Sequence, residues 1–208
     1  MPILLDVEIS PSGSRSISRE ISAEYIKVWK EKNPTGQVVL RDLDKNPVPH
    51  LDQESISAHR IPEEQRTPSI SEKLAYRKTL IAEVLAADEI LISLPMWNWS
   101  TPSVLKAYFD QIILVGTLDA SRNRNLAGKK VTYILAQGSS YIEGAPREGW
   151  DFATGYMKHV ATVLGSTDVE LIIAEYQLAG IAPGMDEYID AKAKSVEKAK
   201  IAAKKRAA

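Results

Sequence analysis

The hydrophobic and polar positions along the chain predict strands and helices in alternation. Short apolar runs indicate five strands, over about residues 3–9, 37–43, 90–94, 131–136 and 168–174. Apolar residues at helical spacing indicate helices over about residues 17–32, 70–87, 103–114, 152–164 and from 186 onward. Such alternation predicts an α/β fold, a three-layer sandwich in which helices cover both faces of a parallel sheet. At 208 residues the chain fits a single domain, residues 1–208.

The strand at residues 90–94 leads into a loop of aromatic residues and then into a helix. Pro95 closes the strand because proline cannot donate to the ladder, and Ser100 or Thr101 can cap the helix. The loop itself reads Pro95-Met96-Trp97-Asn98-Trp99. Open α/β sheets bind ligands at the carboxyl ends of their strands. Aromatic rings at that edge, with an asparagine and backbone N–H groups, suit a flat heteroaromatic ligand.

A second loop, between the first strand and the first helix, concentrates five serines and a glycine. It reads Ser10-Pro11-Ser12-Gly13-Ser14-Arg15-Ser16-Ile17-Ser18. Free backbone N–H groups and the positive end of a helix dipole favour an anion there, and a phosphate would fit. Serines are also good turn and cap formers, and the loop alone supports both interpretations equally.

A third loop, residues 136–141, follows the fourth strand, and its glycine permits close approach of the backbone. Tyr141 in this loop is as consistent with packing as with a contact to a substrate. Residues 116–128 form a polar connection.

The stretch from residue 44 to 69 has four prolines and no clear periodicity. It is too long for an ordinary connection, so we interpret it as a functional flap or as a segment that covers a partner subunit. His50 and His59 lie in it without the spacing of a metal site, and His159 falls in a predicted helix, where we expect a structural role. No metal site is predicted.

Composition excludes several classes of protein. Twenty-six basic and twenty-seven acidic residues give a net charge of −1, which argues against binding of nucleic acid by charge. The absence of cysteine excludes disulfides, thiolate nucleophiles and Cys-ligated iron–sulfur clusters. No apolar run reaches membrane-spanning length, and the first residues lack a basic leader, so we expect a cytoplasmic protein that does not bind membranes.

The positions of the loops strengthen the argument for a ligand site. In a flavodoxin-like strand order, 2-1-3-4-5, the topological switch lies between the first and third strands. Those strands carry the serine loop and the aromatic loop. The sequence also resembles a known family, the FMN-dependent NADH-azoreductases and related NAD(P)H:quinone oxidoreductases of flavodoxin-like fold. The resemblance covers nearly the whole chain, and its most specific stretch, residues 95–100, is similar to the family's Pro-Met-Tyr-Asn-Phe flavin loop with both aromatics enlarged to tryptophan.

The resemblance implies FMN as cofactor and NADH or NADPH as electron donor. The cofactor-binding residues that it implies are Ser10, Ser16, Ile17 and Ser18 for the phosphate, Pro95, Met96, Trp97, Asn98 and Trp99 for the isoalloxazine ring, and Ala136, Gln137, Gly138 and Ser139 for the pyrimidine end. In the last loop Gln137 replaces the family's usual arginine and Ser139 its second glycine. No catalytic side chain is required, because the flavin carries the hydride at N5. Backbone N–H groups around Asn98 and Gly138 are candidates for hydrogen bonds to N5 and to the N1/O2 edge.

The resemblance further implies a ping-pong reduction of quinones or azo compounds by a homodimer. Two alternatives remain at this point. One is a non-catalytic flavodoxin-type electron carrier, which is weakened by the lack of a strongly acidic charge balance. The other is a flavin-binding or nucleotide-binding regulatory module, because a fold alone does not determine function.

Overall fold

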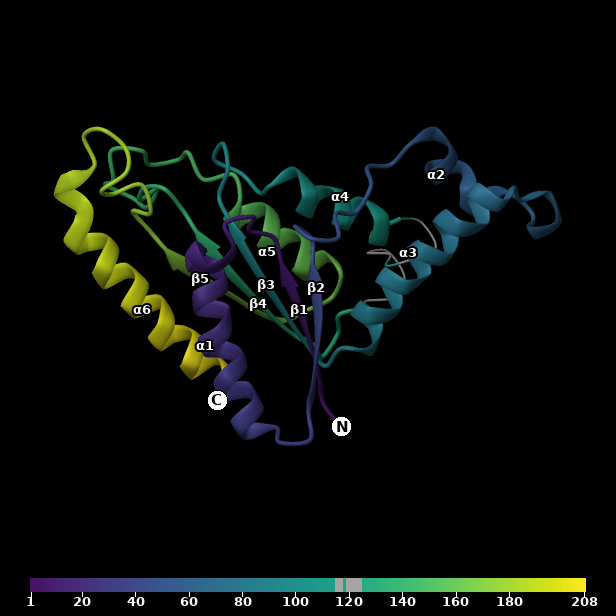
Figure 1. Cartoon of the computed structure of the whole chain (residues 1–208), viewed down its shortest axis with the longest axis horizontal. Coiled ribbons are helices and arrows are strands. Elements are labelled where there is room, and N and C mark those ends of the chain that lie inside the picture. Colours follow the sequence, from purple (N-terminus) through teal and green to yellow (C-terminus); the bar gives the residue numbers. More distant parts are fainter. Residues whose placement is uncertain (115–117, 119–124) are drawn as a thin grey trace.

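The fold is built on one parallel sheet. The structure is a computed structural model that describes residues 1–114, 118 and 125–208. The strands are β1 (Ile3–Glu8), β2 (Gln37–Asp42), β3 (Glu89–Pro95), β4 (Lys130–Ala136) and β5 (Asp168–Ala174). They form a five-stranded sheet in the order β2-β1-β3-β4-β5, with every pair parallel. The flavodoxin-like fold and strand order are thus confirmed, and all five carboxyl ends meet at the upper edge in Figure 1.

Helices cover both faces of this sheet. Helices α1 (Ile17–Lys32) and α6 (Ile189–Ala207) lie side by side on one face, at the left of Figure 1. Helices α3 (Pro68–Ala86), α4 (Ser103–Ile112) and α5 (Thr154–Val163) cover the other. Within the described ranges no helix has the length and apolar character needed to cross a bilayer.

The strands supply both cores by alternation. Leu4 and Leu91 pack with the buried residues of α1 and α6, whereas Leu5 and Ile92 pack with those of α3, α4 and α5. Successive side chains of a strand point to opposite faces, so a strand between two helix layers must be apolar at nearly every position. This explains why β3 and β4 are nearly continuous hydrophobic runs in the sequence, whereas Asp6 and Glu8 interrupt the run in β1.

The proline-containing stretch after β2 is more ordered than its sequence suggests. It contains the short helix α2 (Gln53–Ser57) and two 3₁₀ turns, at residues 58–60 and 63–65. Arg77 of α3 donates to the Ser55 carbonyl at 2.9 Å, and Gln111 of α4 donates to the Pro49 carbonyl at 3.0 Å. A helix of five residues is too short to show a hydrophobic period, which is why sequence analysis missed it.

The starts of two helices differ from those that the sequence predicts. The cap expected at Ser100 or Thr101 is wrong, because α4 begins at Ser103 with Pro102 as its N-cap residue and no side-chain cap. The helix expected from residue 152 begins at Thr154, and Phe152 is exposed. Most of the predicted connection at 116–128 lies outside the described residues.

Candidate functional site

A cleft of about 550 Å³ opens at the carboxyl edge of the sheet. The loops that follow β1, β3, β4 and β5 line it, together with one residue of α6. The lining residues are Ser10, Ser12, Arg15, Ser16, Ile17, Ser18, Pro95, Met96, Trp97, Asn98, Trp99, Ala136, Gly138, Tyr141, Arg147, Gln177, Leu178, Ile181 and Lys192. None of these residues is acidic, so the described wall of the cleft favours an anionic ligand.

The serine loop forms one end of the cleft. Gly13 has a φ of +54°, a left-handed conformation that glycine adopts without steric cost, and it begins a 3₁₀ turn. Ser16 is the N-cap of α1, and its Oγ accepts from the Arg19 amide at 3.3 Å and lies 3.2 Å from the Ser18 Oγ. Because Ser16, Ile17 and Ser18 all line the cleft, the positive end of the α1 dipole lies beside it.

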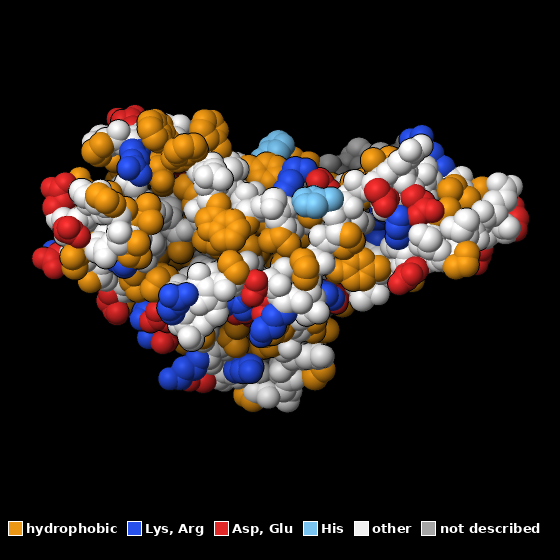
Figure 2. All heavy atoms as spheres, turned by 45° about the horizontal axis from the view of Figure 1, so that its top comes forward, with side chains coloured by type: hydrophobic (Ala, Val, Ile, Leu, Met, Phe, Trp, Pro, Cys, Tyr) orange, Lys and Arg blue, Asp and Glu red, His pale blue; other side chains and the backbone are white. Residues whose placement is uncertain are grey.

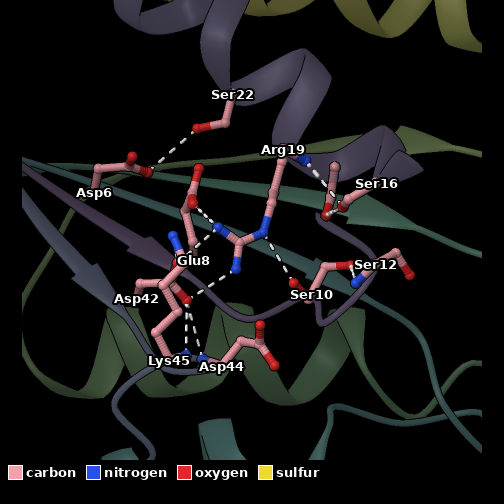
Figure 3. Close-up of polar contacts among 11 residues, drawn as sticks. Asp6, Glu8, Ser10, Ser12, Ser16, Arg19, Ser22, Asp42, Asp44 and Lys45 are labelled. Carbon is pink, nitrogen blue, oxygen red and sulfur yellow. Dashed lines mark hydrogen bonds and ion pairs between the residues drawn. The ribbon is translucent and has the colours of Figure 1, made fainter. Parts of the chain in front are cut away.

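Three acidic residues and one arginine lie beneath the serine loop, outside the lining of the cleft. The Arg19 guanidinium contacts Asp42 and Glu8, and Asp6 on β1 accepts a hydrogen bond from the Ser22 hydroxyl at 3.2 Å (Figure 3). Burial raises the pKa of Asp6 to about 6, against the smaller opposing effects of Ser22 and Arg19. Burial alone would also raise the pKa of Asp42, but hydrogen bonds from Arg19 and from backbone amides outweigh it and hold that pKa below its ordinary value.

The aromatic loop is a tight turn. The amides of Trp97 and Ser100 each donate to the other residue's carbonyl at 3.0 Å. Between them Asn98 and Trp99 have φ values of +47° and +64°. Positive φ at a bulky residue such as tryptophan is uncommon and is a form of strain that concentrates at functional sites. The turn includes the backbone of Ser100, and α4 begins only at Ser103, so Ser100 is not at the N-cap position of the helix.

The surroundings hold this turn in place. The Met96 amide donates to the Ala136 carbonyl at 2.7 Å, and the Phe152 amide donates to the Trp99 carbonyl at 2.9 Å. The Trp99 ring meets Trp150 edge-on, with 5.6 Å between ring centroids. Within the described part of the chain, the amide of Asn98 donates to no acceptor, so its N–H group is available to a ligand.

Only two of the four predicted cofactor-binding residues of the third loop line the cleft. Ala136 and Gly138 line it, whereas the side chains of Gln137 and Ser139 are buried away from it. Gln137 continues the sheet pairing, since its amide donates to Ala174 at 2.9 Å and its carbonyl accepts from Gln177 at 3.0 Å. Its side chain therefore follows the alternation of the strand and points away from the face that Ala136 and Gly138 share.

Several lining residues escaped the sequence analysis. Arg15, Arg147 and Lys192 add three cations, and the loop after β5 contributes Gln177, Leu178 and Ile181. A signal existed for that loop, because it follows the carboxyl end of a parallel strand just as the other three do. Arg147 and Lys192 gave no such signal, since only the folding of distant segments brings them to the cleft.

A second hollow of about 630 Å³ lies on the other side of the aromatic turn. It shares Trp97 and Asn98 with the first cleft. The other lining residues come from α4, from α5, from the segments that precede these two helices and from the segment before α2, namely His50, Ser100, Thr101, Pro102, Ser103, Lys106, Phe152 and Tyr156. Exposed aromatic side chains surround both hollows, with Trp97 46% and Phe152 68% exposed. Figure 2, in which this edge is turned forward, shows hydrophobic side chains gathered in patches along it.

The histidines do not form a metal centre in the described residues. No group of three His, Cys, Asp or Glu side chains comes together there. His50 lines the second hollow, His59 lies in a 3₁₀ turn, and His159 is exposed on α5.

Comparison with known proteins places the whole chain in one family. A model of the flavodoxin-like fold matches residues 3–206. An FMN-dependent NADH:quinone oxidoreductase of Frankia casuarinae is 43% identical over 209 residues, which cover 100% of this chain and 99% of the relative. A protein of the same name from Nostoc sp. is 41% identical over 180 residues, covering 84% and 87% of the two chains.

Solved structures agree on the fold. An azoreductase from Bacillus anthracis superposes with a TM-score of 0.84 at 21% identity, covering 100% of this chain and 99% of the other. An FMN-dependent NADH-azoreductase of the same species, solved in complex with FMN, superposes with a TM-score of 0.83 at 19% identity, covering 100% and 98%. From its fold and its sequence relatives, this chain belongs to the family of FMN-dependent NADH:quinone oxidoreductases.

Proposed function

We propose that this protein is an FMN-dependent oxidoreductase that takes electrons from NADH or NADPH and passes them to quinones or azo compounds. The observation that carries the proposal is the single cleft into which the loops after β1, β3 and β4 bring eleven of the thirteen residues implied by the family resemblance. Relatives that match 100% and 91% of this chain bear the name FMN-dependent NADH:quinone oxidoreductase. We further propose that residues 1–208 act as one domain, since both helix layers pack on the same sheet.

The cleft fits FMN in size and in chemistry. Its volume of about 550 Å³ lies within the range of ligand pockets for cofactors and small molecules. The serine hydroxyls and the start of α1 suit the phosphate, and Met96 to Trp99 offer a turn of apolar and aromatic side chains for the ring. The free amide of Asn98, and that of Gly138, which also has no acceptor among the described residues, suit the acceptor atoms of an isoalloxazine.

The chain's own contribution to the reaction is binding, orientation and charge. FMN, when bound, supplies the chemistry of hydride transfer at its N5 atom. In this proposal the N–H groups of Asn98 and Gly138 would hold the ring of a bound FMN by donating to N5 and to the N1/O2 edge. Arg15, Arg147 and Lys192 raise the positive potential of the cleft without entering the reaction.

Donor and acceptor are proposed to use the same open side of the ring in turn. Trp97 and Trp99 flank that side and are about half exposed, at 46% and 44%. Large rigid rings at this position orient a flat substrate by stacking. The donor must leave before an acceptor of similar shape can enter, which is the physical basis of a ping-pong sequence.

We also propose that the protein works as a homodimer through the edge that carries both hollows. Trp97, Trp99, Trp150, Phe152 and Ile142 are all exposed there. Apolar exposure of this extent is uncommon on a monomer and marks a contact surface. Two-fold symmetry is the usual way in which identical patches cover each other.

The proposed function is tested by spectroscopy and steady-state kinetics on the purified protein. Addition of FMN is expected to yield a yellow complex whose visible absorption is bleached by NADH or NADPH and restored by a quinone. Parallel initial-rate lines at varied donor and acceptor concentrations would support the ping-pong sequence. A protein that binds no FMN, or a bound flavin that neither nucleotide bleaches, would contradict the proposal.

A further inference from the structure

Arg19 lies in the first turn of α1, beneath the serine loop. Its guanidinium Nε donates to the Ser10 carbonyl at 2.9 Å, and its backbone amide donates to the Ser16 Oγ at 3.3 Å. One residue therefore holds both the point where the chain leaves β1 and the point where it enters α1 (Figure 3). Arg19 itself is not among the residues that line the cleft.

The other end of the guanidinium is fixed by carboxylates. Its Nη1 and Nη2 donate to the two oxygens of Asp42 at 3.0 and 2.9 Å, and Nη1 also contacts Glu8. Asp42 is in turn held by the amides of Asp44 and Lys45, at 3.1 and 3.2 Å. A bidentate arginine–carboxylate pair of this kind is both strong and directional. A continuous set of hydrogen bonds thus connects the backbone after β2, through Asp42 and Arg19, to the serine loop.

The positive charge of Arg19 is neutralised by two carboxylates, so it does not attract a ligand directly. Glu8 and Asp42 lie at the carboxyl ends of neighbouring strands, and without Arg19 their negative charges would face the serine loop uncompensated. The arginine therefore acts on an anion in the cleft indirectly, by fixing the backbone around it and by neutralising the acids below it.

From this geometry we infer that Arg19, held by Asp42 and Glu8, is a positioning residue for the FMN phosphate. The inference rests on the proposed function, because it assigns the serine loop to that phosphate. In this inference the hydrogen bonds of Arg19 do more than stabilise the fold. They keep the serine loop in the conformation that binds the phosphate. Lysine cannot replace this fork, because one ammonium cannot contact the Ser10 carbonyl and both oxygens of Asp42 together.

Comparing FMN with riboflavin isolates the effect, because riboflavin has the same ring and ribityl chain without the phosphate. We expect R19K to lower FMN affinity, measured by quenching of flavin fluorescence, by about tenfold, the equivalent of one hydrogen bond to a charged group. Riboflavin affinity should change by less than about twofold, since the ring loop is untouched. D42N should lower the ratio of FMN to riboflavin affinity in the same direction, because it leaves Arg19 only one good acceptor on that side chain.

The chain offers a matched control in Arg41. This arginine also pairs with both oxygens of a carboxylate, that of Glu83 on α3, through its Nε and Nη2, and its side chain is 16% exposed, against 15% for Arg19. Arg41 does not line the cleft. R41K should therefore lower the thermal stability as R19K does, measured by circular dichroism, and leave the ratio of FMN to riboflavin affinity unchanged.

The outcomes separate this inference from the proposed function. A wild-type protein that binds neither flavin would overturn both, and one that binds them equally would remove the phosphate assignment. A wild-type preference for FMN that survives in R19K, or that falls equally in R41K, would overturn the role of Arg19 alone. If R19K does not fold, the same measurement on D42N tests the inference. An unchanged ratio of FMN to riboflavin affinity in D42N would overturn it.

Discussion

At the scale of single residues, the carboxylates beneath the serine loop are held by hydrogen bonds. Asp6 is 3% exposed and is hydrogen-bonded to Ser22. Its folded pKa of about 6 exceeds the ordinary value of 3.8 because burial disfavours the charged form. The folded state therefore keeps this proton to higher pH than the unfolded state does.

This shift predicts a specific dependence of stability on pH. The contribution of Asp6 to the free energy of unfolding should fall as pH rises from about 4 to about 6 and stay constant above that. D6N removes the charge and keeps an oxygen for Ser22, so it should stabilise the protein at pH 8 by up to about 3 kcal/mol and have little effect at pH 4. Urea unfolding at both pH values measures this, with D44N as an exposed control. An equal effect of D6N at both pH values would contradict the prediction.

A second residue-scale prediction concerns the hydroxyls of Ser16 and Ser18. Both line the cleft, and replacing both by alanine should weaken FMN binding, since each hydrogen bond to a charged group contributes about 1.5–3 kcal/mol. Loss of the Ser16 cap should also lower stability by about 1 kcal/mol. Fluorescence titration with FMN measures the affinity, and S14A, an exposed serine of the same loop outside the cleft, is the control. If the double variant binds FMN as the wild type does, the phosphate lies elsewhere.

At the scale of elements, the loops at the carboxyl ends of the strands form most of the cleft. The loop after β4 and the loop after β5 are joined closely, since the Leu178 amide donates to the Gly138 carbonyl at 3.1 Å. A side chain at Gly138 would place its Cβ 2.7 Å from the Leu178 Cδ1. A side chain at Gly138 would therefore force the Leu178 side chain to move.

The corresponding prediction is that G138A lowers both thermal stability and FMN affinity, because the Leu178 side chain, which lines the cleft, must shift to make room. Shortening the opposing side chain should relieve the clash. The double variant G138A/L178A is therefore expected to be more stable than the sum of the two single changes implies, by a coupling of about 1 kcal/mol. Strict additivity of the two changes in unfolding experiments would show that the clash is not the cause.

The aromatic turn supports a prediction about specificity. Trp97 and Trp99 line the cleft and are about half exposed. Replacing either by phenylalanine should therefore change the shape of the proposed acceptor site more than it changes the affinity for FMN. We expect W97F and W99F to change the ratio of kcat/KM between a quinone and an azo dye, with FMN affinity nearly unchanged. Identical ratios in both variants and the wild type would rule out a role for the two rings in acceptor choice.

At the scale of the whole molecule, the exposed aromatic edge predicts a dimer. Light scattering coupled to size exclusion, at low micromolar concentration with FMN bound, should yield a mass of twice 23.0 kDa. F152D places a charge in this edge outside the first cleft and should shift the mass toward one chain. A wild-type protein with the mass of one chain and full activity would contradict the shared-edge proposal.

Much of this fold follows from the sequence alone, because burial on two faces forces β3 and β4 to be apolar at nearly every position. The flavodoxin-like order and the grouping of residues 10–18 with residues 95–99 follow from the rule that parallel strands present their carboxyl ends together. Local patterns also located the end of α1 after Lys32 and the end of α5 before Gly165. These features depend on spacing along the chain, which the sequence states directly.

Tertiary structure decided what depends on contacts between distant segments. Nothing in the sequence pairs Arg19 with Asp42 or brings Lys192 of α6 to the cleft, because both require the sheet order and the helix packing to exist first. The same holds for Gln137, whose side chain turns inward only because its backbone pairs with the loop after β5. The sequence by itself thus determined which loops meet at the site, and folding decided which side chains of those loops face it, since orientation is set by backbone pairing and by packing across the chain.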